Sequence, residues 1–156
     1  MPKEIERKFI VIDDSWKNYV VGKVKLKQAY IAKNEICIVR VRTSAEKAWL
    51  TVKGRQTGFT RSEFEYHIPV ADAEEMMGEF SPDKQIVKTR FFINYHGDEW
   101  IIDVFEKNNA GLILAEIELE NEKQTFDLPP WVGKEVSSDF KYTNSSLAEY
   151  PYNKWK

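Results

Sequence analysis

The chain has 156 residues, of which 42% are hydrophobic and 13% are aromatic, enough for an independent core in one domain. Its formal net charge of -2 gives no global attraction for nucleic acid or an anionic membrane, so neither is expected as a partner. Cys37 is the only cysteine, which excludes an internal disulfide and a cysteine-based zinc site. No stretch approaches the roughly 20 apolar residues of a membrane span and no secretory signal is present, so a cytoplasmic protein is expected.

Strand signals dominate the chain. Apolar, β-branched and aromatic residues alternate with polar ones, which predicts strands near residues 3–11, 25–32, 35–43, 47–54, 59–68, 84–94, 99–106 and 112–120. Short connectors rich in turn residues separate most of them. Eight short strands at this spacing imply an antiparallel meander, and closing the sheet into a barrel removes its exposed edges. The predicted fold class is therefore mainly β with a few helices.

Helical signals are few. Asp72 has the features of an N-cap, and Glu75 completes a capping box ahead of an apolar run. A second helix is expected to start at residues 13–15. After Leu128 the sequence becomes rich in Pro, Ser, Asn and Tyr, so residues 129–156 are expected to form short helices that pack on the barrel. Residues 1–156 are thus expected to form a single domain.

Charged side chains recur at alternate positions of the expected strands. Residues i and i+2 of a strand point to the same face, and the intervening residues here are largely apolar. The cations in this pattern are Lys8, Arg40, Arg42, Lys53, Arg61, Lys88 and Arg90. The anions are Glu4, Glu6, Glu63, Glu65, Asp103, Glu116 and Glu118. A closed sheet with a charged, water-filled lumen would satisfy this pattern.

A simpler reading is that these residues form cross-strand ion pairs on a solvated face, where each pair contributes about 0 to 1 kcal/mol. However, like charges occupy positions i and i+2 in Glu4/Glu6, Arg40/Arg42, Glu63/Glu65 and Glu116/Glu118. Structural pairing alone seldom selects such repulsive neighbours. A bound species that neutralises them is therefore expected.

The two sets of charges suit different parts of one ligand. Guanidinium and ammonium groups bind phosphate oxygens. Carboxylates are the hard oxygen ligands that Mg²⁺ or Mn²⁺ prefers, and such ions commonly bridge protein carboxylates to substrate phosphates. The combination predicts a site for a metal complex of a polyphosphate.

The order of these motifs resembles a known family. The sequence Glu4-Ile5-Glu6-Arg7-Lys8 is similar to the ExExK motif of the CYTH superfamily, the triphosphate tunnel metalloenzymes. Further features of that family follow in order: Arg40-Val-Arg42, Thr51-Val-Lys53, Glu63-Phe-Glu65, Lys88-Thr-Arg90, Ile102-Asp103-Val-Phe and Ala115-Glu116-Ile-Glu118. Gly133-Lys-Glu-Val136 and Tyr142-Thr-Asn144 also resemble its carboxyl-terminal segment. The resemblance covers nearly the whole chain.

This resemblance implies an eight-stranded antiparallel barrel whose lumen is a triphosphate tunnel. It assigns metal binding to Glu4, Glu6, Glu116 and Glu118, with Asp103 as a further or water-mediated ligand. It assigns phosphate binding to Lys8, Arg40, Arg42, Lys53, Lys88 and Arg90, and we add Arg61 to that set. Glu63 and Glu65 would orient the cations or contribute to a second metal position. Glu4, Glu6, Lys8 and Tyr30 are the candidates for catalytic residues that act on water or the leaving group.

The expected function is metal-dependent hydrolysis of a small triphosphate, with inorganic tripolyphosphate converted to pyrophosphate and phosphate. Thiamine triphosphatase, nucleoside triphosphatase and class IV adenylate cyclase are alternatives in the same family. A non-catalytic module that binds polyphosphate or a nucleotide is the alternative from another class. The apolar outward-facing positions leave room for helices or a homodimer partner on the barrel.

Overall fold

The computed structural model describes residues 3–155. Nine strands dominate these residues: β1 (Lys3–Val11), β2 (Val20–Lys33), β3 (Cys37–Thr43), β4 (Ala48–Gly54), β5 (Thr60–Ile68), β6 (Gln85–Tyr95), β7 (Asp98–Phe105), β8 (Ile113–Glu118) and β9 (Val132–Glu135). The α-helices are α1 (Val70–Phe80) and α2 (Asn144–Glu149), and the 3-10 helices are η1 (Ser15–Tyr19), η2 (Lys107–Asn109), η3 (Phe140–Tyr142) and η4 (Tyr152–Lys154). Within this part of the chain, no helix is long and apolar enough to cross a membrane.

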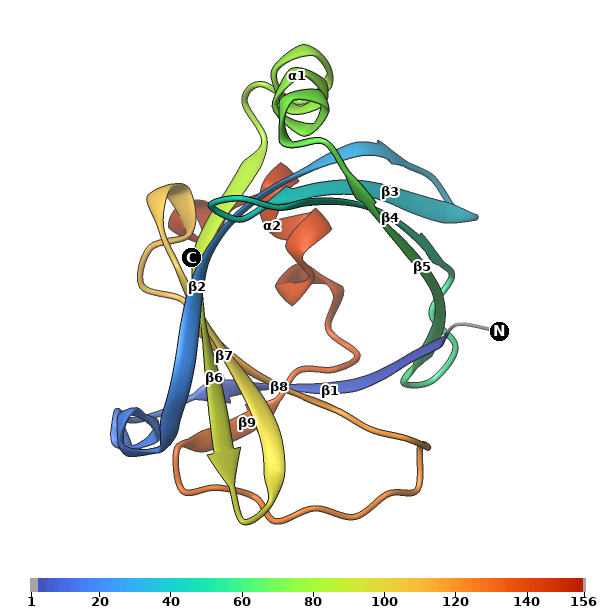
Figure 1. The fold of residues 1–156 in the computed structure, drawn as a ribbon. Helices are drawn as coiled ribbons and strands as arrows, with labels where there is room; N and C mark the ends of the chain where they lie inside the picture. The colour runs from blue at the N-terminus through green and yellow to red at the C-terminus, as the bar shows by residue number, and fades with distance from the viewer. Residues whose placement is uncertain (1–2, 156) are drawn as a thin grey trace.

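Eight of the strands form a closed antiparallel ring (Figure 1). Neighbouring strands follow the order β5-β4-β3-β2-β6-β7-β8-β1, and β1 pairs again with β5. In these registers Lys3 lies opposite Ser62 and Lys8 lies opposite Glu116, so β1 joins the two ends of the sheet. The prediction of a mainly β fold with an eight-stranded, closed antiparallel sheet is confirmed, but the prediction of a meander is wrong, because β2 pairs with β6 and β1 pairs with β5 and β8.

Strand β2 is longer than its sequence pattern indicates. It begins at Val20 rather than near residue 25, because its first residues pair with β6 alone. Pairing with β3 starts only at Lys27, which lies opposite Thr43. The early part of β2 therefore has β6 on one side only, and its exposed lysines Lys23 and Lys25 are typical of a protected sheet edge.

The two predicted helix starts differ from the observed ones. Pro69 occupies the N-cap of α1 without a side-chain hydrogen bond, so the prediction of a capping box at Asp72 is wrong. Asp72 lies instead in the first turn, where its charge complements the helix dipole. The other expected helix is only the short η1. At its start, the Asp13 carboxylate accepts a hydrogen bond of 2.8 Å from the backbone N–H of Ser15, the first residue of η1.

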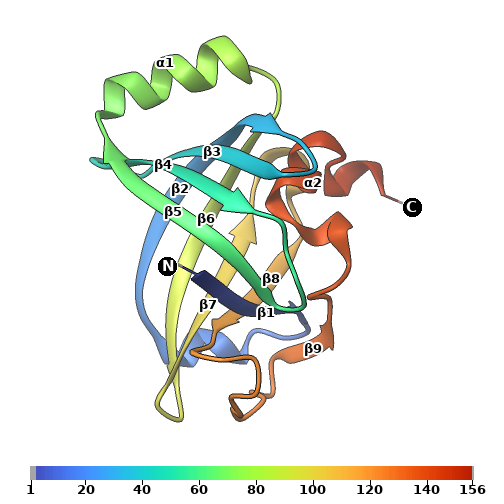
Figure 2. The ribbon, with the colours of Figure 1, turned by 90° about the vertical axis from the view of Figure 1, so that its right-hand side faces the viewer.

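Apolar side chains cover much of the outer face of the ring. Trp100 and Trp131 are fully buried in a cluster beneath η1 and the chain that follows β8. On another side, α1 lies across the outside of β2, β3 and β4 and packs Met77 there (Figure 2). These layers bury the apolar residues of the strands, which leaves the other side-chain face for the charged residues.

The carboxyl-terminal residues enter one end of the ring. Figure 1, which looks along the ring, shows α2 within its outline. Leu147 of α2 and Val136 are buried against Ile86 and Leu114. Ile86 has the strand parity of Lys88, and Leu114 has that of Glu116, so this contact lies on the inner face. The segment thereby packs an apolar layer across one end of the lumen.

Strand β9 fixes this segment to β1, and the sequence predicts only helices there. Arg7 Nε and Nη2 donate to the Glu135 carboxylate at 2.8 and 2.6 Å. Ser137 Oγ donates to Glu135 at 2.6 Å and accepts from the backbone N–H of Lys8 at 2.9 Å. A Cβ atom at Gly133 would collide with Ile12, so glycine permits the close approach of β9. The outward side chain of Arg7 thus braces the strand that carries Glu6 and Lys8.

Candidate active site

The ring encloses a cavity of about 230 Å³ whose wall is mainly charged. Residues from all eight strands of the ring contribute to it because alternate side chains of each strand point inward. The expected site residues on its wall are Glu4, Glu6, Lys8, Tyr30, Arg40, Arg42, Lys53, Arg61, Glu63, Glu65, Lys88, Arg90, Glu116 and Glu118. The structure therefore brings together residues that lie up to 114 positions apart in the chain.

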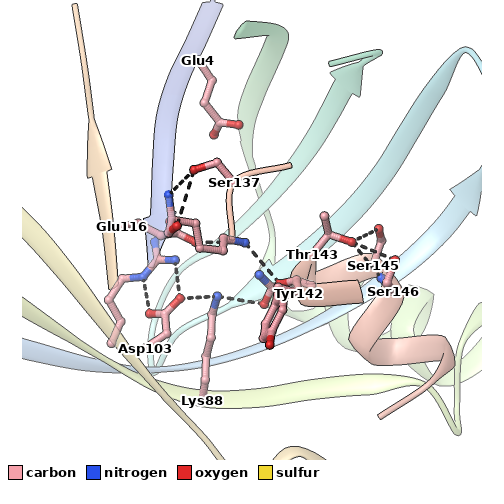
Figure 3. A network of polar contacts seen from close by, with 12 residues as sticks. Glu4, Lys88, Asp103, Glu116, Ser137, Tyr142, Thr143, Ser145 and Ser146 are labelled. Carbon is pink, nitrogen blue, oxygen red and sulfur yellow. Dashed lines mark hydrogen bonds and ion pairs between the residues drawn. The ribbon is translucent and has the colours of Figure 1, made fainter. Parts of the chain in front are cut away.

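Asp103 is the expected metal ligand that does not line this cavity. Its carboxylate accepts from Lys88 Nζ at 2.8 Å (Figure 3) and from Arg90 at 2.9 and 3.1 Å. Burial acts to raise the pKa of Asp103, but Arg90 and Lys88 hold it well below its usual range. Because both oxygens are engaged by cations, Asp103 is a buried counter-ion in this structure rather than a member of the carboxylate cluster.

The other carboxylates gather where β1 and β8 pair. Glu6 lies opposite Glu118, so like charges face one another across the ladder, while the next inward pair sets Lys8 opposite Glu116. Burial, with the neighbouring charges of Glu116 and Glu4, raises the pKa of Glu6 to about 7. Burial and the charge of Glu4 also raise the pKa of Glu118. At Glu116, by contrast, burial acts to raise the pKa, but the charges of Lys8 and other cations of the wall hold it below its usual value.

The donor set of this cluster fits a hard divalent cation. All of its side chains offer carboxylate oxygens, and a cation would relieve both the burial of charge and the mutual repulsion that raise the pKa values of Glu6 and Glu118. Among residues 3–155, no three His, Cys, Asp or Glu side chains are already arranged as a metal cage. Instead, Glu4 accepts from Lys53 Nζ at 3.1 Å through both oxygens, and Glu116 lies 3.4 Å from Lys8 Nζ. Lysine ammonium groups are thus the partners of these two carboxylates.

Arg42 is one of two wall cations, with Arg61, that form no ion pair with a carboxylate among residues 3–155. Its Nε donates to Gln28 Oε1 at 2.9 Å. Burial, followed by the charges of Arg40 and Arg90, lowers the pKa of Arg42 to about 9. A guanidinium in this position is poised to bind an anion.

Arg40 and Tyr30 lie opposite each other on β3 and β2, two residues along from the facing pair Arg42 and Gln28. Arg40 Nη2 donates to Thr51 at 3.2 Å and lies 3.4 Å from Glu65 Oε2, while its buried Nε has no partner. The Tyr30 hydroxyl accepts from Gln28 Nε2 at 3.0 Å. Gln28 therefore links Tyr30 to Arg42, and Arg40 keeps a donor free for a ligand.

The remaining expected cations lie nearer the carboxylates. Lys53 is also 3.4 Å from Glu63, so Glu63 and Glu65 both contact a cation of the wall. Arg61 donates through Nε to the carbonyl of Gly54 at 3.1 Å, which holds its side chain along the end of β4. The wall thus changes from lysine–carboxylate pairs at β1 to guanidinium groups at β3, where Arg40 contacts Glu65 and Arg42 has only Gln28 as a side-chain partner among the described residues.

Sequence reasoning missed the part of the wall that comes from outside the eight strands. Ser137, Asp139, Thr143, Asn144 and Ser145 of the carboxyl-terminal segment line the cavity. Strand parity could not find them, because they lie in loops and at the start of a short helix. The one available signal was the resemblance of Tyr142-Thr-Asn144 to the family's carboxyl-terminal segment.

Comparisons with known proteins agree with this geometry. The family model described as the CYTH domain matches residues 2–150. The chain is 43% identical to an inorganic triphosphatase of Acetivibrio thermocellus over 156 residues, covering 100% of this chain and 99% of that protein. It is 33% identical to an inorganic triphosphatase of Nitrosomonas europaea over 149 residues, covering 93% and 96%. The crystal structure of the inorganic triphosphatase NE1496 matches with a TM-score of 0.68 and 32% identity, covering 93% of this chain and 97% of that one. The chain therefore belongs to the CYTH domain family.

Proposed function

We propose that this protein is a metal-dependent inorganic triphosphatase that hydrolyses tripolyphosphate to pyrophosphate and phosphate inside the ring. The observation that carries the proposal is the guanidinium of Arg42, without an ion pair, beside Arg40 and Arg90 in a cavity whose wall also carries a cluster of carboxylates. Pure anion binding gains nothing from such carboxylates. The relatives at 43% and 33% identity, both named inorganic triphosphatase, support the same activity.

In this proposal the two halves of the wall have separate roles. Lys8, Arg40, Arg42, Lys53, Arg61, Lys88 and Arg90 bind phosphate oxygens. Glu4, Glu6, Glu116 and Glu118 hold Mg²⁺ or Mn²⁺. Asp103, with both oxygens bound to Lys88 and Arg90, fixes those cations instead of the metal. The substrate is a small molecule, and neither nucleic acid nor a membrane is proposed as a partner. The protein is proposed to be cytoplasmic. That it forms a homodimer stays a prediction.

Catalysis of phosphoryl transfer depends on positioning the groups and neutralising charge. The metal, when bound, supplies Lewis acidity toward the phosphate oxygens and acidifies a bound water. The arginines hold the triphosphate so that a water attacks one phosphorus atom in line with the bridging oxygen that leaves. Glu6 and Glu4 orient this water and accept its proton at a carboxylate oxygen. Lys8 and Tyr30 hydrogen-bond to the pyrophosphate that leaves.

A substrate panel tests this function. Tripolyphosphate should be hydrolysed faster than ATP. Pyrophosphate should be cut poorly, because its two phosphoryl groups leave several wall cations without a partner. Steady-state rates for the three substrates should be measured with Mg²⁺, with Mn²⁺ and with chelator. ATP turnover equal to that of tripolyphosphate would indicate a nucleotide-directed enzyme, and cyclic AMP among the products would indicate a cyclase. Tight binding without phosphate release would indicate a binding module.

Replacing Arg42 by alanine should mainly weaken substrate binding. We expect KM for tripolyphosphate to rise about 10- to 100-fold, since a charge-assisted hydrogen bond to phosphate contributes about 1.5–3 kcal/mol. The concentration of metal that gives half-maximal rate should change little, because Arg42 does not belong to the carboxylate cluster. The exposed Arg55, which lies outside the cavity wall, provides the matched control R55A. An unchanged KM in R42A would remove Arg42 from the phosphate site.

A further inference from the structure

We propose that Asn144, the first residue of α2, is a positioning residue that holds the Lys88 ammonium in the orientation needed to bind a phosphate group of the substrate. This inference rests on the proposed triphosphatase function and adds a group that the strand motifs do not contain. It makes the carboxyl-terminal segment a functional part of the site as well as a cover for one end of the ring.

The contacts of Lys88 carry the argument. Lys88 is fully buried, and its Nζ donates to Asp103 Oδ2 at 2.8 Å and to Asn144 Oδ1 at 3.0 Å. Lys88 and Asn144 both line the cavity, whereas Asp103 does not. Asn144 is therefore the partner of Lys88 that stands beside the substrate position.

The number of donors explains what this contact does. A lysine ammonium has three N–H groups at the end of a flexible stem. Two fixed acceptors, on Asp103 and Asn144, define the rotation of the ammonium and leave one N–H for a ligand. The amide oxygen of Asn144 is neutral, so it orients Lys88 without cancelling the positive charge that attracts phosphate. A carboxylate at position 144 would hold the ammonium and reduce its attraction for an anion.

The fold fixes Asn144 at this position. Thr143 caps α2 by accepting from the backbone N–H of Ser146 at 3.2 Å, and the fully buried Leu147 anchors the same turn in the apolar layer at the end of the lumen. Tyr142, two residues before Asn144, also reaches a wall cation, because its carbonyl accepts from Lys8 Nζ at 3.3 Å (Figure 3). One short stretch of chain thus contacts two lysines of the site.

The test compares N144A and N144D with the wild type on tripolyphosphate. We expect KM to rise about tenfold in N144A, because one hydrogen bond to a charged group is lost. KM should rise further in N144D, because the new charge repels the substrate. In both variants kcat should stay within about threefold of the wild-type value, and Tm should stay within a few degrees. Asn153 is exposed in the same segment and outside the cavity wall, so N153A and N153D are matched controls with no expected effect.

The outcomes separate this inference from the proposed function. A wild-type protein that hydrolyses no triphosphate overturns both. An active wild type with unchanged KM in N144A and N144D overturns only the role of Asn144. A fall in Tm and in kcat at constant KM also overturns it, because that result marks a purely structural residue. If N144A does not fold, N144D, whose side chain has the shape of asparagine, decides the question by the same KM criterion.

Discussion

Replacing Asp103 by asparagine should lower the free energy of unfolding by about 3–5 kcal/mol, because two cations are left buried without their counter-charge. The Asp103 side chain is 1% exposed and Lys88 is fully buried, so water cannot replace the lost interaction. The pKa of Asp103 lies far below the value of about 3.9 for an unfolded chain. The contribution of Asp103 to the free energy of unfolding is therefore fully present above about pH 5 and is lost as the pH falls through the acid range. The difference in free energy of unfolding between D103N and the wild type should therefore narrow in acid. Urea denaturation at pH 7 and at pH 3 measures both effects.

Two further variants isolate the cause. Asp83 is exposed in the turn before β6, so D83N controls for the loss of one carboxylate and should change stability by less than about 0.5 kcal/mol. The double variant K88M/D103N removes one of the orphaned cations and should recover part of the stability, a coupling that a double-mutant cycle measures. A D103N protein as stable as the wild type would show that the pair contributes no net stabilisation.

The largest effect on activity is expected for Glu116→Gln. The amide keeps the shape of the side chain but loses the charge that holds a hard divalent cation, so metal-dependent turnover should fall by at least about 100-fold. The fold should survive, because Glu116 lies at the cavity wall and its ion-pair partner Lys8 keeps a hydrogen bond to the Tyr142 carbonyl. Tripolyphosphate hydrolysis across a Mg²⁺ and Mn²⁺ titration, with a thermal melt, gives the comparison.

The control for this variant is Glu120, an exposed carboxylate just beyond the end of β8. E120Q should retain wild-type turnover at every metal concentration. Partial recovery of E116Q at high metal concentration would fit a weakened metal site. Wild-type turnover of E116Q at ordinary Mg²⁺ concentration would exclude Glu116 from metal binding.

The ring and most of the cavity wall could be predicted from the sequence because strand parity is a local property. Arg40 and Arg42 share a face in any extended strand, and the apolar Val41 between them requires the opposite face to be buried. Closure follows from eight antiparallel strands whose charged faces need a common ligand. The inward direction of the strand residues in the wall therefore follows from alternation.

Other features depend on tertiary context and could not be predicted in the same way. Parity places Asp103 with the other inward charges, but only the register of β6 and β7, which sets Arg90 opposite Asp103, shows that it pairs with cations. Asn144 belongs to a short helix whose position is set by the burial of Leu147. Pro69 displaced the expected helix start because its fixed φ suits an N-cap position. The positions of Asp103 and Asn144 depend on partners distant in sequence, and the start of α1 depends on a neighbouring residue, Pro69, that takes the N-cap position.

The position of β1 in the ring has a consequence for biosynthesis. This strand is made first, yet its partners are β5, β8 and β9, and the Arg7–Glu135 contact spans 128 residues. On the ribosome, β1 must therefore wait until most of the chain has emerged before it can be paired on both sides. Contacts of such long range slow folding, and an unpaired strand is open to association with other chains meanwhile. The charges of Glu4, Glu6 and Lys8 on one face of this strand oppose such association, so residues placed for the cavity also protect the nascent chain.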